Sequence, residues 1–289
     1  MIITLKNDRL TVDIDTLGAE MQAVTGADGT QYLWGGDAAY WGNRATNLFP
    51  HVGRLTDQAY TVGGKRYQMG IHGFLRHMET EAKDVTATHA LFEMRDTPDT
   101  LAQYPFPFVM GVDYRLAGDT LHLVYRVRNT GDGTMYFGVG GHPGFRVPLE
   151  KGLAFEDYAL AFEGESRRWL LSDTSYTMTG ETVPYPKADG VLPLRHDLFD
   201  QDAIILENEG RQARLYSDKG QRAVTLRHPQ MPYLGLWHKP HSDAPYVCLE
   251  PWLSLPARHG VVEAFETQPG LVHLVAGDNY ENAWSIQFE

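Results

Sequence analysis

The stretch LAGDTLHLVYRV, residues 116–127, decides the fold class of this chain. Apolar and polar side chains largely alternate from Leu121 onward, and a period of two is that of a β-strand with one buried face. The turn residues Gly118 and Asp119 precede this strand and follow another apolar segment. The stretch therefore predicts a β-hairpin, in which a tight turn joins two antiparallel strands.

The same pattern extends toward both ends of the chain. A second hairpin is predicted in YTVGGKRYQ (60–68), where Gly63 and Gly64 supply the positive φ angles of a tight turn. Helix is scarce, and TPDTLAQYP (97–105) predicts one or two turns closed by Pro105. Further strands are predicted in LTVDI (10–14), ARLYS (213–217), AVTLRH (223–228) and AWSIQF (283–288).

The distribution of these strands predicts the domain organisation. Roughly 15 or more strand candidates are spread from end to end, and neither a Pro/Ser-rich linker nor a change in charge divides them. We therefore expect one large all-β domain of the sandwich type over residues 1–289. A repeat of about 20–50 residues is absent, which disfavours a propeller or a β-helix.

The composition is that of a soluble globular protein, with 43% hydrophobic and 21% charged residues over 289 positions. The net charge of −12 argues against nucleic acid or an anionic membrane as a partner. Cys248 is the single cysteine, so an internal disulfide is impossible and a reducing compartment fits best. Neither signal-peptide features nor a run of ~18 apolar residues is found. We therefore expect a cytoplasmic protein.

A histidine set among glycines stands out in GGHPGF (140–145), which follows the predicted strand MYFGV (135–139). We interpret this segment as a turn in which the glycines let the backbone approach a ligand and Pro143 stiffens the exit. His142 can donate or accept a proton near neutral pH. A turn that happens to contain a histidine is the alternative.

A glutamate ends an apolar strand in CLEPWLSLP (248–256). Burial raises the pKa of a carboxyl toward the range of a general base, which makes Glu250 a candidate for that role. Trp252 offers an apolar face on which a sugar ring can stack. The alternative is a structural glutamate held by an arginine.

Two further segments carry side chains suited to a polar ligand. Arg54 follows Gly53 in NLFPHVGRL (47–55), and a planar guanidinium can donate two hydrogen bonds to a ligand. His72 lies in GIHGFLRH (70–77), where the neighbouring glycine favours a bend that turns the ring inward. A surface arginine and a structural core histidine are the respective alternatives.

Together these residues predict acid–base chemistry on a neutral polar substrate. A carboxylate base and a histidine acid would act with the support of Arg54 and His72. Nucleophile-elbow, phosphate-loop and dinucleotide motifs are absent. The aromatic residues expected to cover an apolar sugar face are Trp237 in PYLGLWHKP, Trp252 and Phe145.

A catalytic metal is not expected. His51, His72 and His142 could converge in space, but no H-x-H or H-x-x-x-H spacing places two ligands on one element.

Five short motifs, in this order, resemble the aldose 1-epimerase (galactose mutarotase) family, and most closely its bacterial LacX-like branch. The resemblance runs from about residue 5 to about residue 285. The motifs are FPHVGRL (49–55), HGFLR (72–76), GHPGF (141–145), LGLWHKP (234–240) and LEPW (249–252).

The resemblance implies a large β-supersandwich with a sugar groove and an isomerase that needs no cofactor. It implies that Glu250 removes the proton of the anomeric hydroxyl while His142 protonates the ring oxygen, so that the ring opens and recloses as the other anomer. By the same resemblance, Arg54 and His72 line the sugar site and Asp202, in FDQDAIIL, holds sugar hydroxyls. The expected partner is a small sugar, and the expected state is a monomer or homodimer.

One position departs from the family pattern. Gly144 stands where members more often have a large aromatic residue, which predicts extra space near the sugar and an altered preference. A hexose 6-phosphate substrate is one alternative, with Arg54, Arg76 and Arg146 as its basic residues. The others are a non-catalytic sugar-binding or sensor protein and a subunit of a larger assembly.

Overall fold

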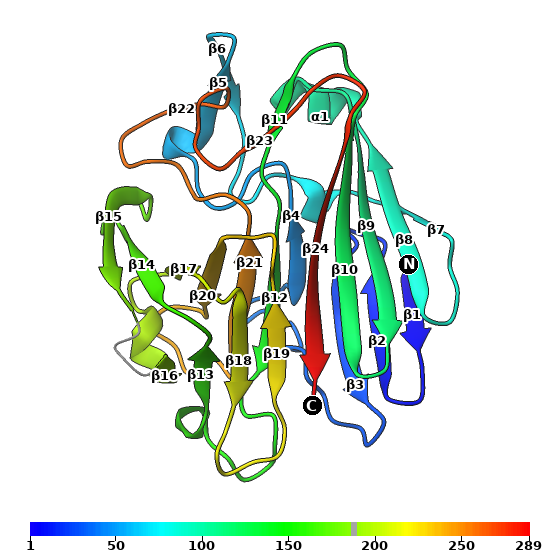
Figure 1. The fold of residues 1–289 in the computed structure, drawn as a ribbon, viewed down its shortest axis with the longest axis vertical. Helices are drawn as coiled ribbons and strands as arrows, with labels where there is room; N and C mark the ends of the chain where they lie inside the picture. Colours follow the sequence, from blue (N-terminus) through cyan, green and yellow to red (C-terminus); the bar gives the residue numbers. More distant parts are fainter. Residues whose placement is uncertain (186–189) are drawn as a thin grey trace.

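The computed structural model describes residues 1–185 and 190–289, and strands dominate this part of the chain (Figure 1). Within these ranges there is one α-helix, α1 (Pro98–Gln103), and no helix is long and apolar enough to cross a membrane. The single-turn 3-10 segments are η1 (Thr56–Gln58), η2 (Leu75–His77), η3 (Phe155–Asp157) and η4 (His196–Phe199).

Two large antiparallel sheets form the body of the structure. The nine-stranded sheet contains, in spatial order, β16 (Val191–Pro193), β13 (Ala159–Phe162), β18 (Gln212–Tyr216), β19 (Val224–Arg227), β24 (Asn279–Phe288), β10 (Thr120–Asn129), β9 (Phe108–Ala117), β8 (His89–Arg95) and β7 (Glu81–Lys83). The seven-stranded sheet contains β15 (Met178–Pro184), β14 (Ser166–Leu171), β17 (Ile204–Asn208), β20 (Tyr233–Trp237), β21 (Tyr246–Trp252), β12 (Gly140–Arg146) and β4 (Ala45–Leu48).

Three small sheets complete the described strands. One contains β1 (Ile2–Lys6), β2 (Leu10–Asp15) and β3 (Met21–Gly26); another contains β22 (Glu263–Ala264), β5 (Ala59–Val62) and β6 (Lys65–Gln68); the last pairs β11 (Met135–Phe137) with β23 (Val272–Leu274).

The local predictions from sequence are confirmed where turn and cap chemistry is strong. The 116–127 stretch forms the β9–β10 hairpin, with Ala117 opposite Thr120. The 60–68 stretch forms the β5–β6 hairpin, in which Gly63 and Gly64 have φ angles of 56° and 76°. The predicted short helix is α1, whose capping box joins Thr97 to Thr100.

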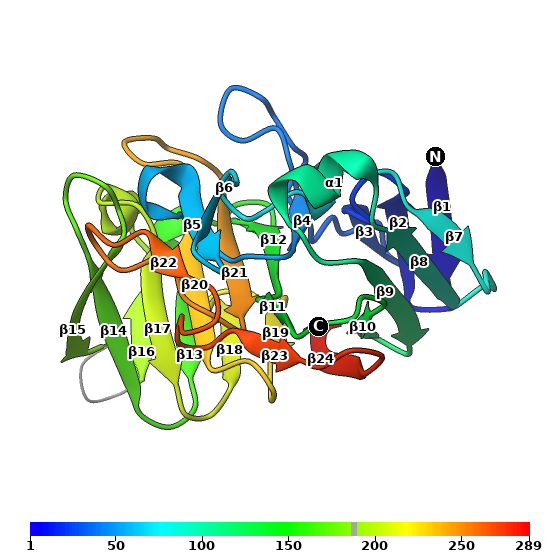
Figure 2. The same ribbon diagram turned by 90° about the horizontal axis from the view of Figure 1, so that it is seen from above.

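The main hydrophobic core lies between the two large sheets. Figures 1 and 2 show β20 and β21 in one layer and β18 and β19 in the layer that faces it. Alternate residues of the seven-stranded sheet, such as Leu206, Leu236 and Leu249, join this core, where they meet Leu226 and Ile286 of the other sheet. The all-β sandwich predicted from sequence is confirmed.

The other face of the seven-stranded sheet lies away from this core. Ile205 and Trp252 point there and form a separate apolar cluster with Leu48. Because neighbouring residues of a strand point to opposite faces, each strand of this sheet contributes to the core and to this second face at once. The candidate site lies on the second face.

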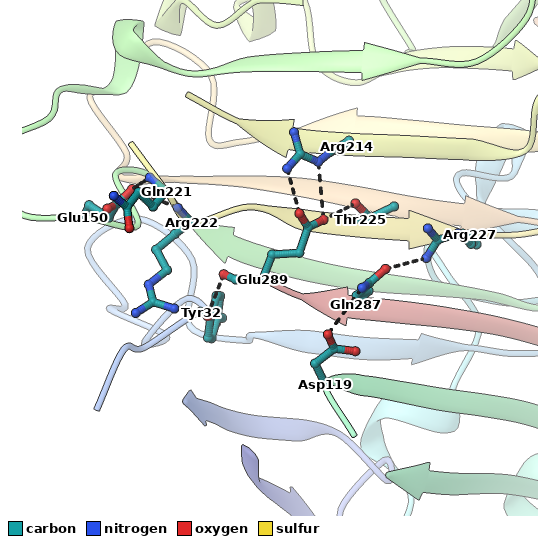
Figure 3. Close-up of polar contacts among 10 residues, drawn as sticks. All are labelled: Tyr32, Asp119, Glu150, Arg214, Gln221, Arg222, Thr225, Arg227, Gln287 and Glu289. Atoms are coloured by element: carbon teal, nitrogen blue, oxygen red, sulfur yellow. Dashed lines mark hydrogen bonds and ion pairs between the residues drawn. The ribbon is translucent and has the colours of Figure 1, made fainter. Parts of the chain in front are cut away.

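Polar side chains tie strand β24 to its neighbours, as Figure 3 shows. The Glu289 carboxylate accepts hydrogen bonds from Arg214, at 3.3 and 2.7 Å, and from the Thr225 hydroxyl, at 2.9 Å. Gln287 accepts one from Arg227 at 3.1 Å. These groups are partly exposed, so each pair contributes only about 0–1 kcal/mol, and apolar burial supplies most of the stability.

Candidate active site

A cavity of about 170 Å³ opens on the second face of the seven-stranded sheet, over the adjacent strands β20, β21 and β12. Seven of the eight residues predicted from sequence for the sugar site line it: Arg54, His72, His142, Asp202, Trp237, Glu250 and Trp252. Two of these residues, Arg54 and Glu250, are 196 positions apart along the chain, and the order of the strands in the sheet brings them together.

His142 and Glu250 lie directly opposite each other on adjacent strands. The register pairs Gly140 with Trp252 and Gly144 with Cys248, which places the two residues midway between these pairs on the same face. His142 Nε2 is 3.2 Å from Glu250 Oε2, and both side chains are buried. The sheet itself therefore sets the geometry of this acid–base pair.

The interpretation of GGHPGF as a turn is wrong, because the segment is strand β12, which lies between β21 and β4 in the sheet. Pro143 pairs with Ala45 of β4, and it has no ladder partner on β21. A Cβ on Gly141 would be 2.6 Å from the Trp284 ring on the core side. A Cβ on Gly144 would be 3.1 Å from the Trp41 ring on the cavity side. The glycines therefore admit aromatic rings of the protein rather than a sugar.

Burial acts on the two members of the pair in opposite directions. It lowers the pKa of His142 to about 3, because the imidazolium form loses its solvation. It raises the pKa of the Glu250 carboxyl well above the ordinary value, and the nearby Asp202 carboxylate adds to that effect. Among the described residues, His142 Nδ1 and Glu250 Oε2 have no hydrogen-bond partner, so the pair retains capacity for a ligand.

His72 is fixed by two hydrogen bonds to Gly53. Its backbone N–H donates to the Gly53 carbonyl at 3.0 Å, and its Nδ1 accepts from the Gly53 N–H at 3.1 Å. The strained φ of 65° at His72 is held by these contacts. Since Nδ1 is an acceptor, the proton of the neutral ring is on Nε2, and burial lowers the pKa of His72 well below its ordinary range. His72 is therefore a fixed hydrogen-bond donor.

Arg54 and Asp202 form an ion pair at the mouth of the cavity. Arg54 Nη2 is 2.9 Å from Asp202 Oδ2, and the Arg54 guanidinium lies 5.6 Å from the centre of the Tyr176 ring. Asp202 has a φ of 68° in the loop before β17, which is uncommon for a residue with a side chain. This pair presents both a donor and an acceptor to a hydroxylated ligand.

Aromatic rings form the walls of the cavity. Trp237 meets the His142 ring edge-on at 5.7 Å, and Trp252 lies 6.1 Å from His72. A Cβ on Gly235 would be 2.9 Å from the Trp252 ring, so the absence of a side chain at this glycine of the LGLW motif leaves room for the indole. The cavity thus combines convergent polar groups with apolar walls, as small-molecule sites do.

The predicted role of Phe145 in sugar binding is wrong. Its side chain is fully buried in the main core, with its ring 6.5 Å from that of Phe288. Strand alternation explains the error, because His142 and Gly144 share one face of β12 and Phe145 points to the other. Arg146, proposed as a phosphate-binding residue, is also absent from the cavity lining and donates to the Leu33 carbonyl at 3.2 Å.

Sequence reasoning missed Trp41 and Tyr176, which both line the cavity. Trp41 follows Tyr40 in a polar, glycine-containing segment, and an aromatic pair in such a loop is the signal that could have drawn attention to it. Tyr176 lies in a segment without a comparable signal. Both reach the site from loops whose path depends on the complete fold.

The residues His72, His142 and Glu250 bring one potential metal-ligand atom each within 4.8 Å of one another. The hydrogen bonding of His72 disfavours ligation, because a neutral ring that accepts a hydrogen bond at Nδ1 carries its proton on Nε2. His51, the third histidine considered from sequence, lies elsewhere, stacked on Phe265 and bonded to Gln268 at 3.0 Å.

Comparison with known proteins identifies the family of the chain. The family model described as "Aldose 1-epimerase" matches residues 1–287. The chromosomal LacX protein of Lactococcus lactis subsp. lactis is 29% identical over 296 residues, which is 99% of each chain.

Two solved structures share the fold over the whole chain. A galactose mutarotase related enzyme from Lactobacillus acidophilus has a TM-score of 0.96 at 33% identity, and the match covers 100% of this chain and 97% of that one. A galactose mutarotase-like protein from Lactobacillus casei has a TM-score of 0.95 at 32% identity, with both chains fully covered. The cross-strand His142–Glu250 pair thus lies in a galactose mutarotase-like sandwich, and the chain belongs to the aldose 1-epimerase family.

Proposed function

We propose that this protein interconverts the α and β anomers of an aldose by general acid–base catalysis, with no cofactor. The observation that carries the proposal is the direct contact between His142 and Glu250 at the base of a cavity lined by polar side chains and aromatic rings. A protein that only binds sugar has no need of a buried acid–base pair at this distance.

The proposed reaction transfers two protons, one from the C1 hydroxyl of the sugar and one to its ring oxygen O5. The Glu250 carboxylate removes the proton of the C1 hydroxyl, the C1–O5 bond breaks as C1=O forms, and His142 delivers its proton to O5. Rotation about C1–C2 and the reverse sequence then close the ring as the other anomer. Acid–base steps of this kind accelerate a reaction by about 10²–10⁴-fold per group.

The protonation state that the reaction needs is within reach of the buried pair. Burial favours the neutral forms of both side chains, as the directions of the two pKa shifts indicate. The pair then holds one proton, and its transfer across the 3.2 Å contact gives an imidazolium and a carboxylate with no change in net charge. The active arrangement therefore needs no proton from solvent.

The surrounding residues are assigned to binding. His72 donates from Nε2 to a sugar oxygen, because its Nδ1 already accepts from Gly53. The Arg54–Asp202 pair offers a donor and an acceptor to neighbouring hydroxyls, and Trp237 and Trp252 cover apolar C–H faces of the ring.

Polarimetry or NMR on freshly dissolved α-D-glucose and α-D-galactose tests the proposal. We expect His142→Ala and Glu250→Gln each to lower the catalysed rate by about 10²-fold or more, with circular dichroism unchanged. His122→Ala is the control, since His122 is exposed on strand β10 of the other sheet. Saturable sugar binding without faster mutarotation by the native protein would instead support a binding or sensor role, and unchanged rates in both variants would contradict the assignment.

A specific observation favours a second candidate, a 6-phosphorylated hexose. Arg76 lines both the cavity and an adjoining hollow of about 450 Å³, and its Nε donates to the His77 ring at 3.0 Å. A guanidinium at this place whose partner is a histidine rather than a carboxylate suits a phosphate.

If a phosphorylated hexose is the substrate, Arg76→Met should raise KM for the 6-phosphate by about tenfold or more, the worth of one charge-assisted contact. The rate with the free sugar should change little. Equal KM values for free and phosphorylated sugars in the native protein would exclude this candidate.

A further inference from the structure

Trp41 covers the imidazole of His142. The two rings are stacked, with centroids 4.7 Å apart and an interplanar angle of 29°. Trp41 also meets Trp237 edge-on at 5.8 Å, so that two indoles enclose the histidine from different sides. Neither the strand pattern nor the acid–base chemistry of the pair explains why a loop residue lies on this ring.

The segment that carries Trp41 is anchored before any sugar arrives. The Trp34 indole N–H donates to the Trp41 carbonyl at 2.8 Å. The Tyr40 hydroxyl donates to Asp243, and Lys239 Nζ donates to the Ala39 carbonyl, both at 2.8 Å. These contacts attach the segment to the loop after β20 and hold the indole in place over His142.

Gly144 provides the space that the Trp41 ring occupies. A Cβ at this position would be 3.1 Å from the Trp41 ring, and 3.3 Å from the Arg44 carbonyl and the Trp34 Cβ. The predicted extra room for the sugar beside Gly144 is therefore filled by the protein itself. An aromatic ring delivered by the loop stands where a side chain at 144 would point.

The face of an indole attracts an imidazolium more strongly than a neutral imidazole. The other ionisable groups that face His142 are Glu250, at 3.2 Å, His72, whose ring centre is 5.4 Å away, and Arg76, whose positive charge opposes protonation of His142. Glu250, the indole face and a contact of the ring with its own backbone favour the charged form. The stack also fixes the plane of the ring, which determines where Nε2 points.

We propose that Trp41 is a positioning residue for the reaction: its indole holds the His142 ring in its productive plane and stabilises the imidazolium that protonates the sugar. This inference rests on the proposed acid role of His142. It predicts that the effect of Trp41 falls on the chemical step rather than on sugar binding alone.

The test compares Trp41→Phe with Trp41→Leu across the pH range, measuring kcat and KM for mutarotation. Phe keeps an aromatic face and Leu keeps only apolar cover, so both exclude water from His142. We expect Trp41→Phe to lie within about threefold of the native kcat and Trp41→Leu to lose on the order of tenfold. The loss in Trp41→Leu should be of similar size across the pH range, because the pair holds a single proton and a less stable imidazolium makes its transfer from Glu250 to His142 less favourable at every pH.

The control variant is Tyr216→Leu, which removes an aromatic ring from strand β18 of the nine-stranded sheet, away from the cavity. Its kcat–pH profile should match that of the native protein. A loss in Trp41→Leu confined to KM, or equal kcat values for the Phe and Leu variants, would overturn the proposal and leave Trp41 as a sugar platform or a packing residue. Absence of mutarotation in the native protein would instead refute the proposed function itself.

A second measurement keeps the proposal testable if Trp41→Leu does not fold. Gly144→Ala pushes on the Trp41 ring without removing any group from the cavity. We expect a several-fold lower kcat with KM nearly unchanged. A native kcat in Gly144→Ala would contradict a role for the precise placement of the indole.

Discussion

At the residue scale, Glu250 shows why a buried carboxyl costs stability. Its side chain is 2% exposed, and among the described residues the only cation-forming group within ion-pair distance is a histidine whose burial disfavours charge. Desolvation of the carboxylate is therefore not offset by a fixed positive group, and the pKa of Glu250 is raised. The same desolvation strengthens any interaction that the group makes with a substrate.

This cost predicts a pH-dependent gain in stability for Glu250→Gln. A carboxyl whose folded pKa is raised contributes stability that is full below its unfolded pKa and is lost as the pH rises through the folded pKa. Glutamine cannot ionise, so the stability difference between variant and native protein should shift in favour of the variant between pH 5 and pH 8. Urea unfolding at several pH values measures it.

Asp202→Asn provides a comparison, because it removes the nearby negative charge and leaves the Glu250 carboxyl in place. Its effect on the pH dependence should have the same sign as that of Glu250→Gln and be smaller. A constant difference between Glu250→Gln and the native protein over this range would show that Glu250 is not desolvated in solution.

At the element scale, β12 carries the site and also explains an error of sequence reading. Gly141, Pro143 and Gly144 are turn formers by propensity, yet they form a strand that is paired on both sides, with β21 and β4. Large rings from other elements lie on both faces of the strand, and only glycine leaves room for them. Tertiary packing therefore overrides local propensity here.

The Gly141→Ala variant tests this account of β12. A Cβ there would be 2.6 Å from the Trp284 ring and 3.2 Å from the Tyr125 hydroxyl, both in the core. We expect the added methyl to lower the free energy of unfolding by about 1–3 kcal/mol, as overpacking does. Thermal or urea unfolding measures the change.

Gly133→Ala is the matched control, because a Cβ at Gly133 would meet no atom within 4 Å and its φ is not in the left-handed region. It should change stability by no more than about 1 kcal/mol. Equal effects of the two substitutions would mean that chain entropy, rather than the Trp284 contact, makes glycine necessary at position 141.

At the scale of the whole molecule, several buried histidines make the fold sensitive to acid. Burial lowers the pKa of His51, His228 and His238 to about 4 each, and that of His142 to about 3. A lowered pKa contributes stability that is present above the unfolded value of about 6.5 and is lost as the pH falls through the folded value. The protein should therefore lose stability steeply between pH 6.5 and 4.

The His228→Asn variant should lose less stability than the native protein as the pH falls. His228 is fully buried and its Nδ1 bonds the Met231 carbonyl at 2.8 Å, a bond that an asparagine amide can replace. We expect the stability difference between pH 7 and pH 4 to shrink by on the order of 3 kcal/mol, measured by urea unfolding. Replacement of the exposed His122 by Asn should leave the slope unchanged, and an unchanged slope in His228→Asn would contradict a neutral buried ring.

The features that can be predicted from the sequence are those that depend on residues close together along the chain. The β9–β10 hairpin follows from alternation and turn residues a few positions apart. His142 and Glu250 could be proposed from their chemistry, but their cross-strand register depends on pairing between segments about 110 residues apart. The loop path that brings Trp41 onto His142 depends on the same distant pairing, and no local pattern encodes it.

The facing direction of Phe145 could have been predicted, given the strand. Once residues 140–146 are taken as β-structure, the period of two places His142 with Gly144 and sends Phe145 to the core. The error came from interpreting glycine and proline as signs of a turn. Their role here is to fit neighbouring rings, which only the assembled sheets reveal.

The position of β24 in the nine-stranded sheet has a consequence for how the protein is made. This strand, at residues 279–288, lies between β19 and β10 and is the only link between the two halves of that sheet in the described chain. During synthesis, hairpins such as β9–β10 can form early, but the sheet stays split until its late-made centre emerges from the ribosome. The nascent chain thus exposes two open strand edges until residues 279–288 have been made, and in that interval a chaperone would protect it.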